Sequence, residues 1–115
     1  MKKSHISKLF NDEGLILENN KALKLDEINV DEIKSFFKKY GIIVFKNFDF
    51  NPQKLTIFTD FFTETYAADA LRRSKRYGKK NITDVDQGFN QIDLHSEASF
   101  APAWPEIVWF YCVTP

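Results

Sequence analysis

The chain has little cysteine, little glycine and no excess of charge, and each shortage excludes a class of protein. Cys112 is the single cysteine among 115 residues, so neither an internal disulfide nor a zinc site made only of cysteines can form. Four glycines stand against twelve phenylalanines, a composition that excludes a disordered tail. Sixteen Lys and Arg residues balance sixteen Asp and Glu residues, and this zero net charge argues against nucleic acid as a partner.

Membrane-spanning and secretory segments are also missing from the sequence. No apolar run approaches the roughly 20 residues that cross a bilayer. The basic start at residues 1–8 is not followed by an apolar stretch, because Asn11, Asp12 and Glu13 interrupt it. We therefore expect a cytoplasmic protein without a membrane partner.

The spacing of apolar residues predicts a helix, a strand and a second helix in the first half of the chain. Residues 26–40 predict an amphipathic helix with Asn29 as its cap and Gly41 as its stop. Residues 42–45 form a short apolar run that predicts a buried strand. Asn51-Pro52 predicts the start of the second helix, whose apolar stripe continues to about Tyr66. For residues 1–25 the pattern leaves two alternatives, short strands or an irregular arm.

The second half of the chain is less regular. Six cations lie within residues 71–80, where they could bind phosphate or nucleic acid, but a solvated loop or a lid over a site is the simpler interpretation. Alternation around Leu94 predicts a strand. Residues 107–113 predict a further strand that lacks polar residues on either face, so it should be covered on both sides, with Cys112 buried as a small apolar residue.

His95 and Glu97 are the candidate metal ligands. Residues two apart on an extended segment point to one face, so the imidazole and the carboxylate would converge. They would supply two thirds of the facial triad of two histidines and one carboxylate that holds Fe(II) in non-haem oxygenases. On spacing alone, a surface histidine near an acid is the commoner explanation. The only other histidine, His5, shows no metal spacing, and we expect it on a flexible arm.

The context of these two residues resembles a known family. Leu94 precedes the histidine, Ser99-Phe100 follows the glutamate, and Trp104-Pro105 introduces the aromatic run at residues 107–113. This block is similar to the core of the taurine-dioxygenase-like (TauD/TfdA) family of iron(II)/2-oxoglutarate-dependent oxygenases, in its branch that carries His-x-Glu. Residues 41–48 resemble the early strand of that family, so the resemblance covers about residues 26–115.

The resemblance implies a fold, a chemistry and roles for four residues. The fold would be α+β, a partial double-stranded β-helix (jelly roll, clavaminate synthase-like) with N-terminal helices and an incomplete barrel. Residues 1–25 would form an N-terminal arm, and residues 26–115 the N-terminal portion of the oxygenase domain. His95 and Glu97 would bind Fe(II), with 2-oxoglutarate as cosubstrate and a small organic molecule as the hydroxylated substrate. Gln91, or its rival Asn90, would face that substrate. Halogenation is disfavoured, because Glu97 fills the position that a halide would need.

The sequence departs from the family pattern in one respect. The family's second histidine ligand and its cosubstrate-binding arginine lie further along the chain than this sequence extends. We therefore expect a portion of an oxygenase that is inactive alone and is completed by the missing C-terminal half or within a homo-oligomer. The alternative is a non-catalytic remnant that acts as a binding module through an open sheet edge.

Overall fold

The computed structural model describes residues 4–9, 11–20, 23–66, 82–84, 91, 93–98 and 101–114. The chain divides into two compact units, Met1–Phe62 and Thr63–Pro115, and each is described by itself. Within the described ranges, no helix has both the length and the apolar character needed to cross a membrane.

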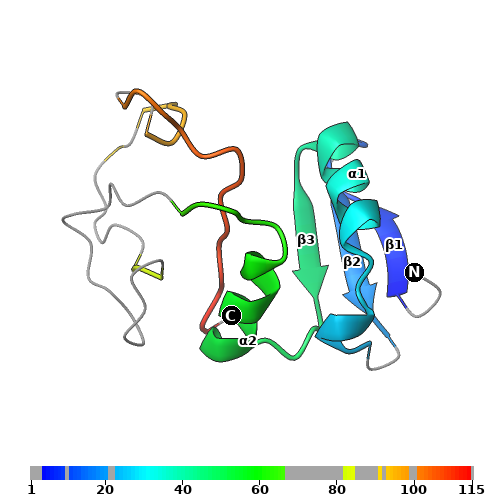
Figure 1. Ribbon diagram of the computed structural model, residues 1–115. Coiled ribbons are helices and arrows are strands. Elements are labelled where there is room, and N and C mark those ends of the chain that lie inside the picture. The colour runs from blue at the N-terminus through cyan, green and yellow to red at the C-terminus, as the bar shows by residue number, and fades with distance from the viewer. Residues whose placement is uncertain are drawn as a thin grey trace. The chain divides into compact units, whose positions relative to one another are not determined.

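A three-stranded mixed sheet organises the first unit (Figure 1). In spatial order its strands are β1 (Ser4–Lys8), β2 (Leu15–Asn19) and β3 (Ile43–Lys46). β2 pairs antiparallel with β1 and parallel with β3. Of the two alternatives for residues 1–25, strands are therefore correct. The expectation that His5 lies on a flexible arm is wrong, because His5 is on β1 opposite Glu18.

The connection between β1 and β2 is a tight loop. Asn11 and Asp12 both have positive φ values, 46° and 75°, and the Leu9 N–H donates to the Gly14 carbonyl at 2.9 Å. A Cβ atom added at Gly14 would lie 3.2 Å from the Leu9 Cβ, so the close approach of the two chains favours glycine here. Lys8 and Asp12 form an exposed ion pair at 2.9 Å, and the hydrogen bond to Asp12 together with its charge raises the pKa of Lys8.

The first predicted helix is confirmed, with a later start. α1 (Val30–Tyr40) follows a separate 3₁₀ turn, η1 (Leu25–Glu27), so the helix proper begins at residue 30 and not at residue 26. The Asn29 side chain accepts a hydrogen bond from the Glu32 N–H at 3.1 Å, as its position predicted. Gly41 ends the helix in the left-handed conformation with φ 71°, which a residue with a side chain adopts only with strain.

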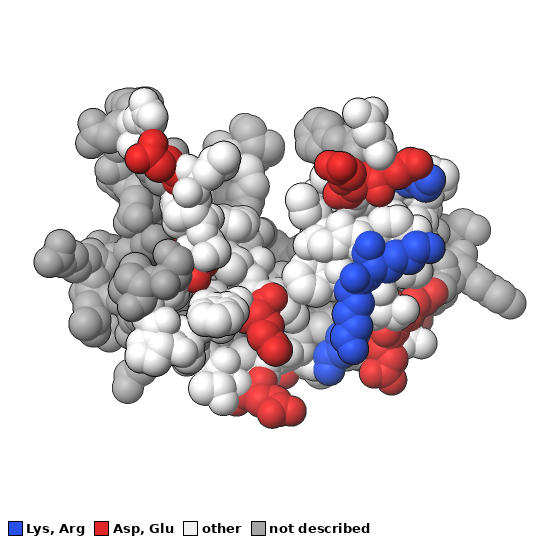
Figure 2. Space-filling view, turned by 90° about the horizontal axis from the view of Figure 1, so that it is seen from above, with Lys and Arg blue, Asp and Glu red and all other residues white. Residues whose placement is uncertain are grey.

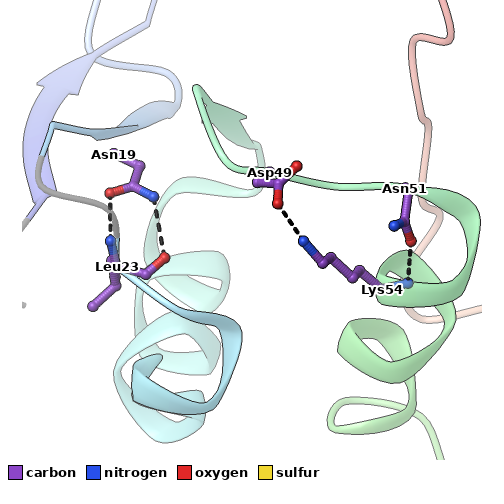
Figure 3. Close-up of polar contacts among 5 residues, drawn as sticks. All are labelled: Asn19, Leu23, Asp49, Asn51 and Lys54. Atoms are coloured by element: carbon purple, nitrogen blue, oxygen red, sulfur yellow. Dashed lines mark hydrogen bonds and ion pairs between the residues drawn. The ribbon is translucent and has the colours of Figure 1, made fainter.

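The second predicted helix is confirmed at its start and shorter at its end. α2 (Pro52–Asp60) is capped by Asn51, whose side chain accepts from the Lys54 N–H at 2.8 Å (Figure 3). The Lys54 ammonium also pairs with Asp49, which holds the segment before the helix (Figure 3). The helix ends before Tyr66, because the Phe61 N–H donates to the carbonyl three residues back and tightens the last turn.

One asparagine closes the connection that leaves β2. The Asn19 carboxamide accepts from the Leu23 N–H at 2.9 Å and donates to the Leu23 carbonyl at 3.1 Å (Figure 3). A single side chain thus satisfies both backbone groups of Leu23, as a neighbouring strand would. This contact fixes where the chain turns toward η1 and α1.

The core of the first unit lies on one face of the sheet. Leu15 and Leu17 of β2 are buried, and in the parallel register they lie beside Ile43 and Phe45 of β3. α1 packs against this sheet in contact with β3 (Figure 1), and its residue Ile33 is buried. Buried positions alternate with half-buried ones at the start of β2, and half-buried positions alternate with exposed ones along β3, as in a sheet covered mainly on one side.

A phenylalanine cluster joins α2 to the sheet. Its members are Phe45, Phe48, Phe50, Phe58 and Phe62. The Phe58 ring lies at the centre, with ring centroids 5.1 Å from Phe45 and 5.2 Å from Phe50, both in edge-to-face geometry. Such pairs add about 0.5–1.5 kcal/mol each beyond the burial of their area. Phe58 is only 1% exposed, so α2 depends on this contact.

The second unit corrects two expectations. Its described residues form no helix or strand beyond an isolated bridge residue at Thr83. Residues 93–98 and 107–113, where two strands were predicted, are therefore not strands in the part that the structure describes: Leu94 is fully exposed at a bend, and residues 107–113 are irregular. A strand forms only where its backbone groups meet a partner strand, and high strand propensity does not replace that partner.

The aromatic segment at residues 107–113 is covered only in part, with Ile107 and Trp109 half-buried. Val108, Phe110 and Val113 are exposed, although they were expected inside a double-sided core. Cys112 is exposed as well, contrary to the buried position expected for it, and its thiol donates to the Thr114 carbonyl at 3.2 Å. The structure therefore shows an α+β chain with an open three-stranded sheet, while the basic run at residues 71–80 lies outside the described residues.

The phenylalanine cluster predicts a sharp difference between neighbours on α2. Phe58→Ala should lower the free energy of unfolding by about 3–5 kcal/mol, because it removes a buried ring and leaves a cavity. Ile57→Ala is the matched control: Ile57 is 47% exposed, and its replacement should change stability by less than about 0.5 kcal/mol. Urea denaturation of the two variants measures the difference, and equal losses would contradict the cluster.

The exposed thiol predicts rapid labelling of the folded chain. A maleimide reagent should modify Cys112 without denaturant, at a rate close to that in urea, because the described surroundings leave the thiol open. Since the chain has one cysteine, mass spectrometry counts a single adduct, and Cys112→Ser gives the blank. Labelling that requires denaturation would show that the segment is covered in solution.

Candidate metal centre

The two candidate ligands lie on a turn-rich segment. His95 follows the bend at Leu94, and Glu97 begins a turn with Ala98. Ala98 has a φ of 53°, and its carbonyl accepts from the Ala101 N–H at 2.9 Å. The expectation that His95 and Glu97 project from a strand is therefore wrong. Local order here comes from turn hydrogen bonds and from side chains bonded to nearby groups.

The His95 ring is fixed by a backbone carbonyl. Its Nδ1 lies 2.7 Å from the carbonyl oxygen of Asp93. A carbonyl oxygen can only accept, so this contact requires a proton on Nδ1, and in the neutral form of the ring the lone pair then lies on Nε2. Metal-bound histidines commonly show this arrangement, in which one nitrogen donates to a carbonyl or carboxylate and the other faces the metal.

Asp93 also binds Gln91, the residue expected to face a substrate. The Gln91 carboxamide donates to Asp93 Oδ1 at 3.1 Å. Three residues at alternate positions, Gln91, Asp93 and His95, are thus linked by two hydrogen bonds, and we call them the 91–95 clamp. The rival candidate, Asn90, lies outside the described residues.

From the sequence, Asp93 can be offered only as an additional metal ligand, and no pattern assigns it a role in positioning His95. Its bond to His95 uses the backbone, which every residue has, so the residue type carried no signal for it. The bond to Gln91 uses the Asp93 side chain. The only sign of it in the sequence is that an amide and a carboxylate lie two residues apart. The structure therefore adds Asp93 to the residues considered at this site.

The donor groups lie at the surface. Gln91, Asp93, His95 and Glu97 are all exposed. Across the described part of the chain, no three His, Cys, Asp or Glu side chains gather in a group that could hold a metal ion. His95 and Glu97 are thus two candidate donors two residues apart in the sequence, and the described residues do not complete a closed centre with them.

Oppositely charged side chains form ion pairs elsewhere on the described surface. On the face shown in Figure 2, Lys side chains lie between groups of Asp and Glu side chains. Lys46 forms an ion pair with Glu18 at 3.6 Å, and the Asn47 carboxamide donates a hydrogen bond to the same carboxylate at 2.9 Å. The expectation that nucleic acid does not bind stays a prediction, because the basic run at residues 71–80 is outside the described ranges.

Comparison with known proteins gives one match. The model of the family described as taurine catabolism dioxygenase TauD, TfdA family matches residues 4–115. No curated protein and no solved structure matches significantly. The family match begins at residue 4 and so includes β1 and β2, which the resemblance drawn from the sequence had left out. Because the match spans nearly the whole sequence, the chain belongs to the TauD/TfdA family.

Proposed function

We propose that this chain is part of an Fe(II)/2-oxoglutarate-dependent dioxygenase that hydroxylates a small organic substrate. Membership of the family supports the oxygenase class. The observation that carries the assignment of residues is the bond from His95 Nδ1 to the Asp93 carbonyl, which leaves Nε2 available as a ligand. The complete domain would be a jelly roll to which the open sheet and its helices contribute the N-terminal part.

The donor set fits ferrous iron. A neutral imidazole nitrogen and a carboxylate oxygen are two of the three ligands of the facial triad, which leaves coordination positions for the cosubstrate and oxygen. His95 Nε2 and the Glu97 carboxylate would hold the ion, which supplies the activation of oxygen when bound together with 2-oxoglutarate. The chain's own contribution is to orient the imidazole through Asp93 and to present the carboxylate two residues away.

A third ligand must come from elsewhere. The triad needs a second histidine, and no suitable group of three side chains lies within the described ranges. We propose that this histidine and the groups that bind 2-oxoglutarate belong to a C-terminal half of the barrel or to a second copy of the chain. In that case the 115 residues bind iron weakly and do not complete the reaction.

A non-catalytic binding module is the second candidate function. The uncovered apolar side chains of Val108, Phe110 and Val113 favour it, because exposed apolar groups gathered in one segment are typical of interaction surfaces. The two candidates differ in one measurable property, since only the oxygenase needs His95 and Glu97 to bind a metal.

Anaerobic titration with Fe(II) tests the ligands. We expect the wild-type chain to bind one ion, and His95→Ala and Glu97→Ala each to weaken binding by at least about tenfold, which is the smallest loss reported even for second-shell partners. His5→Ala is the matched control, since His5 lies on β1 and is the only other histidine. Isothermal calorimetry measures the affinities. Equal binding by all four proteins, or none by the wild type, would contradict the oxygenase and favour the binding module.

A turnover assay tests the need for further groups. With Fe(II), 2-oxoglutarate and ascorbate, the chain alone should form no succinate above a control without protein, because two ligands neither close nor preorganise the centre. Succinate that exceeds this control, and that disappears in His95→Ala, would show that the chain is a complete catalyst.

A further inference from the structure

We propose that Asp93 is a positioning residue that holds His95 in the tautomer needed for metal binding and that Gln91 holds Asp93 in turn. The inference rests on the proposed function only for the role of the metal. The tautomer itself is a property of the chain, and it can be measured with no metal present. Gln91, expected to contact a substrate, would instead serve as the anchor of the 91–95 clamp.

The choice of tautomer decides which ring nitrogen can bind a metal. In a neutral imidazole one nitrogen carries the proton and only the other has a free lone pair. His95 lies on an exposed segment, where no packed core restricts the ring. The 2.7 Å bond to the Asp93 carbonyl is therefore the contact that selects the Nδ1–H form. A hydrogen bond of ordinary net strength shifts such a ratio by about fivefold.

The carbonyl can act in this way only if Asp93 itself is held. The described part of this segment is not in a strand, so no sheet ladder fixes its backbone. The bond from the Gln91 carboxamide to Asp93 Oδ1 at 3.1 Å provides a local restraint on the same residue. Asp93 thus accepts one bond on its side chain and one on its backbone, and the two together limit the rotation of the peptide whose oxygen His95 uses.

A competing role for Asp93 is that of a direct metal ligand. Its carboxylate lies two residues before His95, as Glu97 lies two residues after it. In the structure Oδ1 already accepts from Gln91, and the contact with His95 is made by the backbone. Positioning and ligation make different predictions for Asn at this position, because Asn keeps an acceptor oxygen for Gln91 and loses the negative charge.

The tautomer can be measured by NMR in the full chain. With ¹⁵N-labelled histidine, long-range ¹H–¹⁵N correlation distinguishes protonated from unprotonated ring nitrogens at about two pH units above the ordinary histidine pKa of about 6.5. His5 provides an internal reference. We expect His95 to be mainly Nδ1–H, and Asp93→Ala to lower the ratio of Nδ1–H to Nε2–H several-fold while Asp93→Asn restores it. A wild-type His95 whose tautomer ratio equals that of His5 would overturn the inference.

A backbone substitution tests the carbonyl directly. Replacing Leu94 with its α-hydroxy acid turns the Asp93–Leu94 amide into an ester, whose carbonyl oxygen is a weaker acceptor, and every side chain stays in place. The Nδ1–H form of His95 should lose about fivefold in its ratio to the other tautomer, and His5 should not change. An unchanged His95 ratio in the ester would overturn the positioning role, even if Asp93→Ala had an effect.

Fe(II) titration of the same proteins separates this inference from the proposed function. The ester and Asp93→Ala should each weaken Fe(II) binding by about 10–100-fold, as losses of second-shell partners do. Asp93→Asn should bind Fe(II) as the wild type does, since Asn keeps the acceptor oxygen that Ala lacks. Loss of binding in Asp93→Asn with an unchanged tautomer would make Asp93 a ligand and overturn the inference. A wild-type chain that binds no Fe(II) but holds His95 as Nδ1–H would refute the proposed function and support the positioning by Asp93.

Discussion

Leu17 is fully buried at the centre of β2, and β2 has a strand hydrogen-bonded along each of its edges. That pairing of backbone groups on both sides is the constraint on which the first unit depends. A buried N–H or carbonyl without a partner costs as much as a lost hydrogen bond, so apolar side chains can be buried only where the backbone beneath them is paired. β2 meets that condition, and the helices and the phenylalanine cluster then cover the face that it presents. The aromatic segment at residues 107–113 carries equally apolar side chains but is not in a strand, and most of its side chains are exposed, with only Ile107 and Trp109 half-buried.

The elements that the sequence predicted well are those whose causes are local. Asn29 and Asn51 each accept a hydrogen bond from an N–H three residues along, so the signal and the contact lie within one turn. A strand was also predicted at residues 42–45, and β3 lies at Ile43–Lys46, but the burial expected for it is wrong, because Val44 is 40% exposed and Ile43 and Phe45 are only half-buried. For β1 and β2 the pattern left an alternative open, since the pairing of residues 15–18 with residues 43–46 joins segments far apart in the chain. The wrong prediction at residues 107–113 has the same origin. The sequence shows a high strand propensity there, but it does not show whether a partner strand is present.

The candidate site shows a different division between sequence and structure. His95 and Glu97 were found through a motif, and their spacing alone would not have distinguished them from a surface pair. The geometry first proposed for them, two side chains on one face of a strand, is wrong for this segment. The contact of Asp93 with His95 could not be found from the residue type, because the atom that makes it is a backbone oxygen. The orientation of His95 is thus explained by the hydrogen bonds that link Gln91, Asp93 and His95, and no longer by the periodicity of a strand.

This replacement bears on how such a centre could be assembled. A ligand set that is held by a sheet becomes ordered only when the sheet forms, whereas the 91–95 clamp uses contacts within five residues. Binding of a metal ion must also overcome the entropy of ordering its ligands, so a histidine already fixed in orientation and tautomer lowers that cost. The bonds of the clamp are exposed to water, and each contributes little alone. In a metal centre built on these bonds, the imidazole would be oriented before the centre is stable. The affinity for the metal would come from the further ligands that complete its coordination.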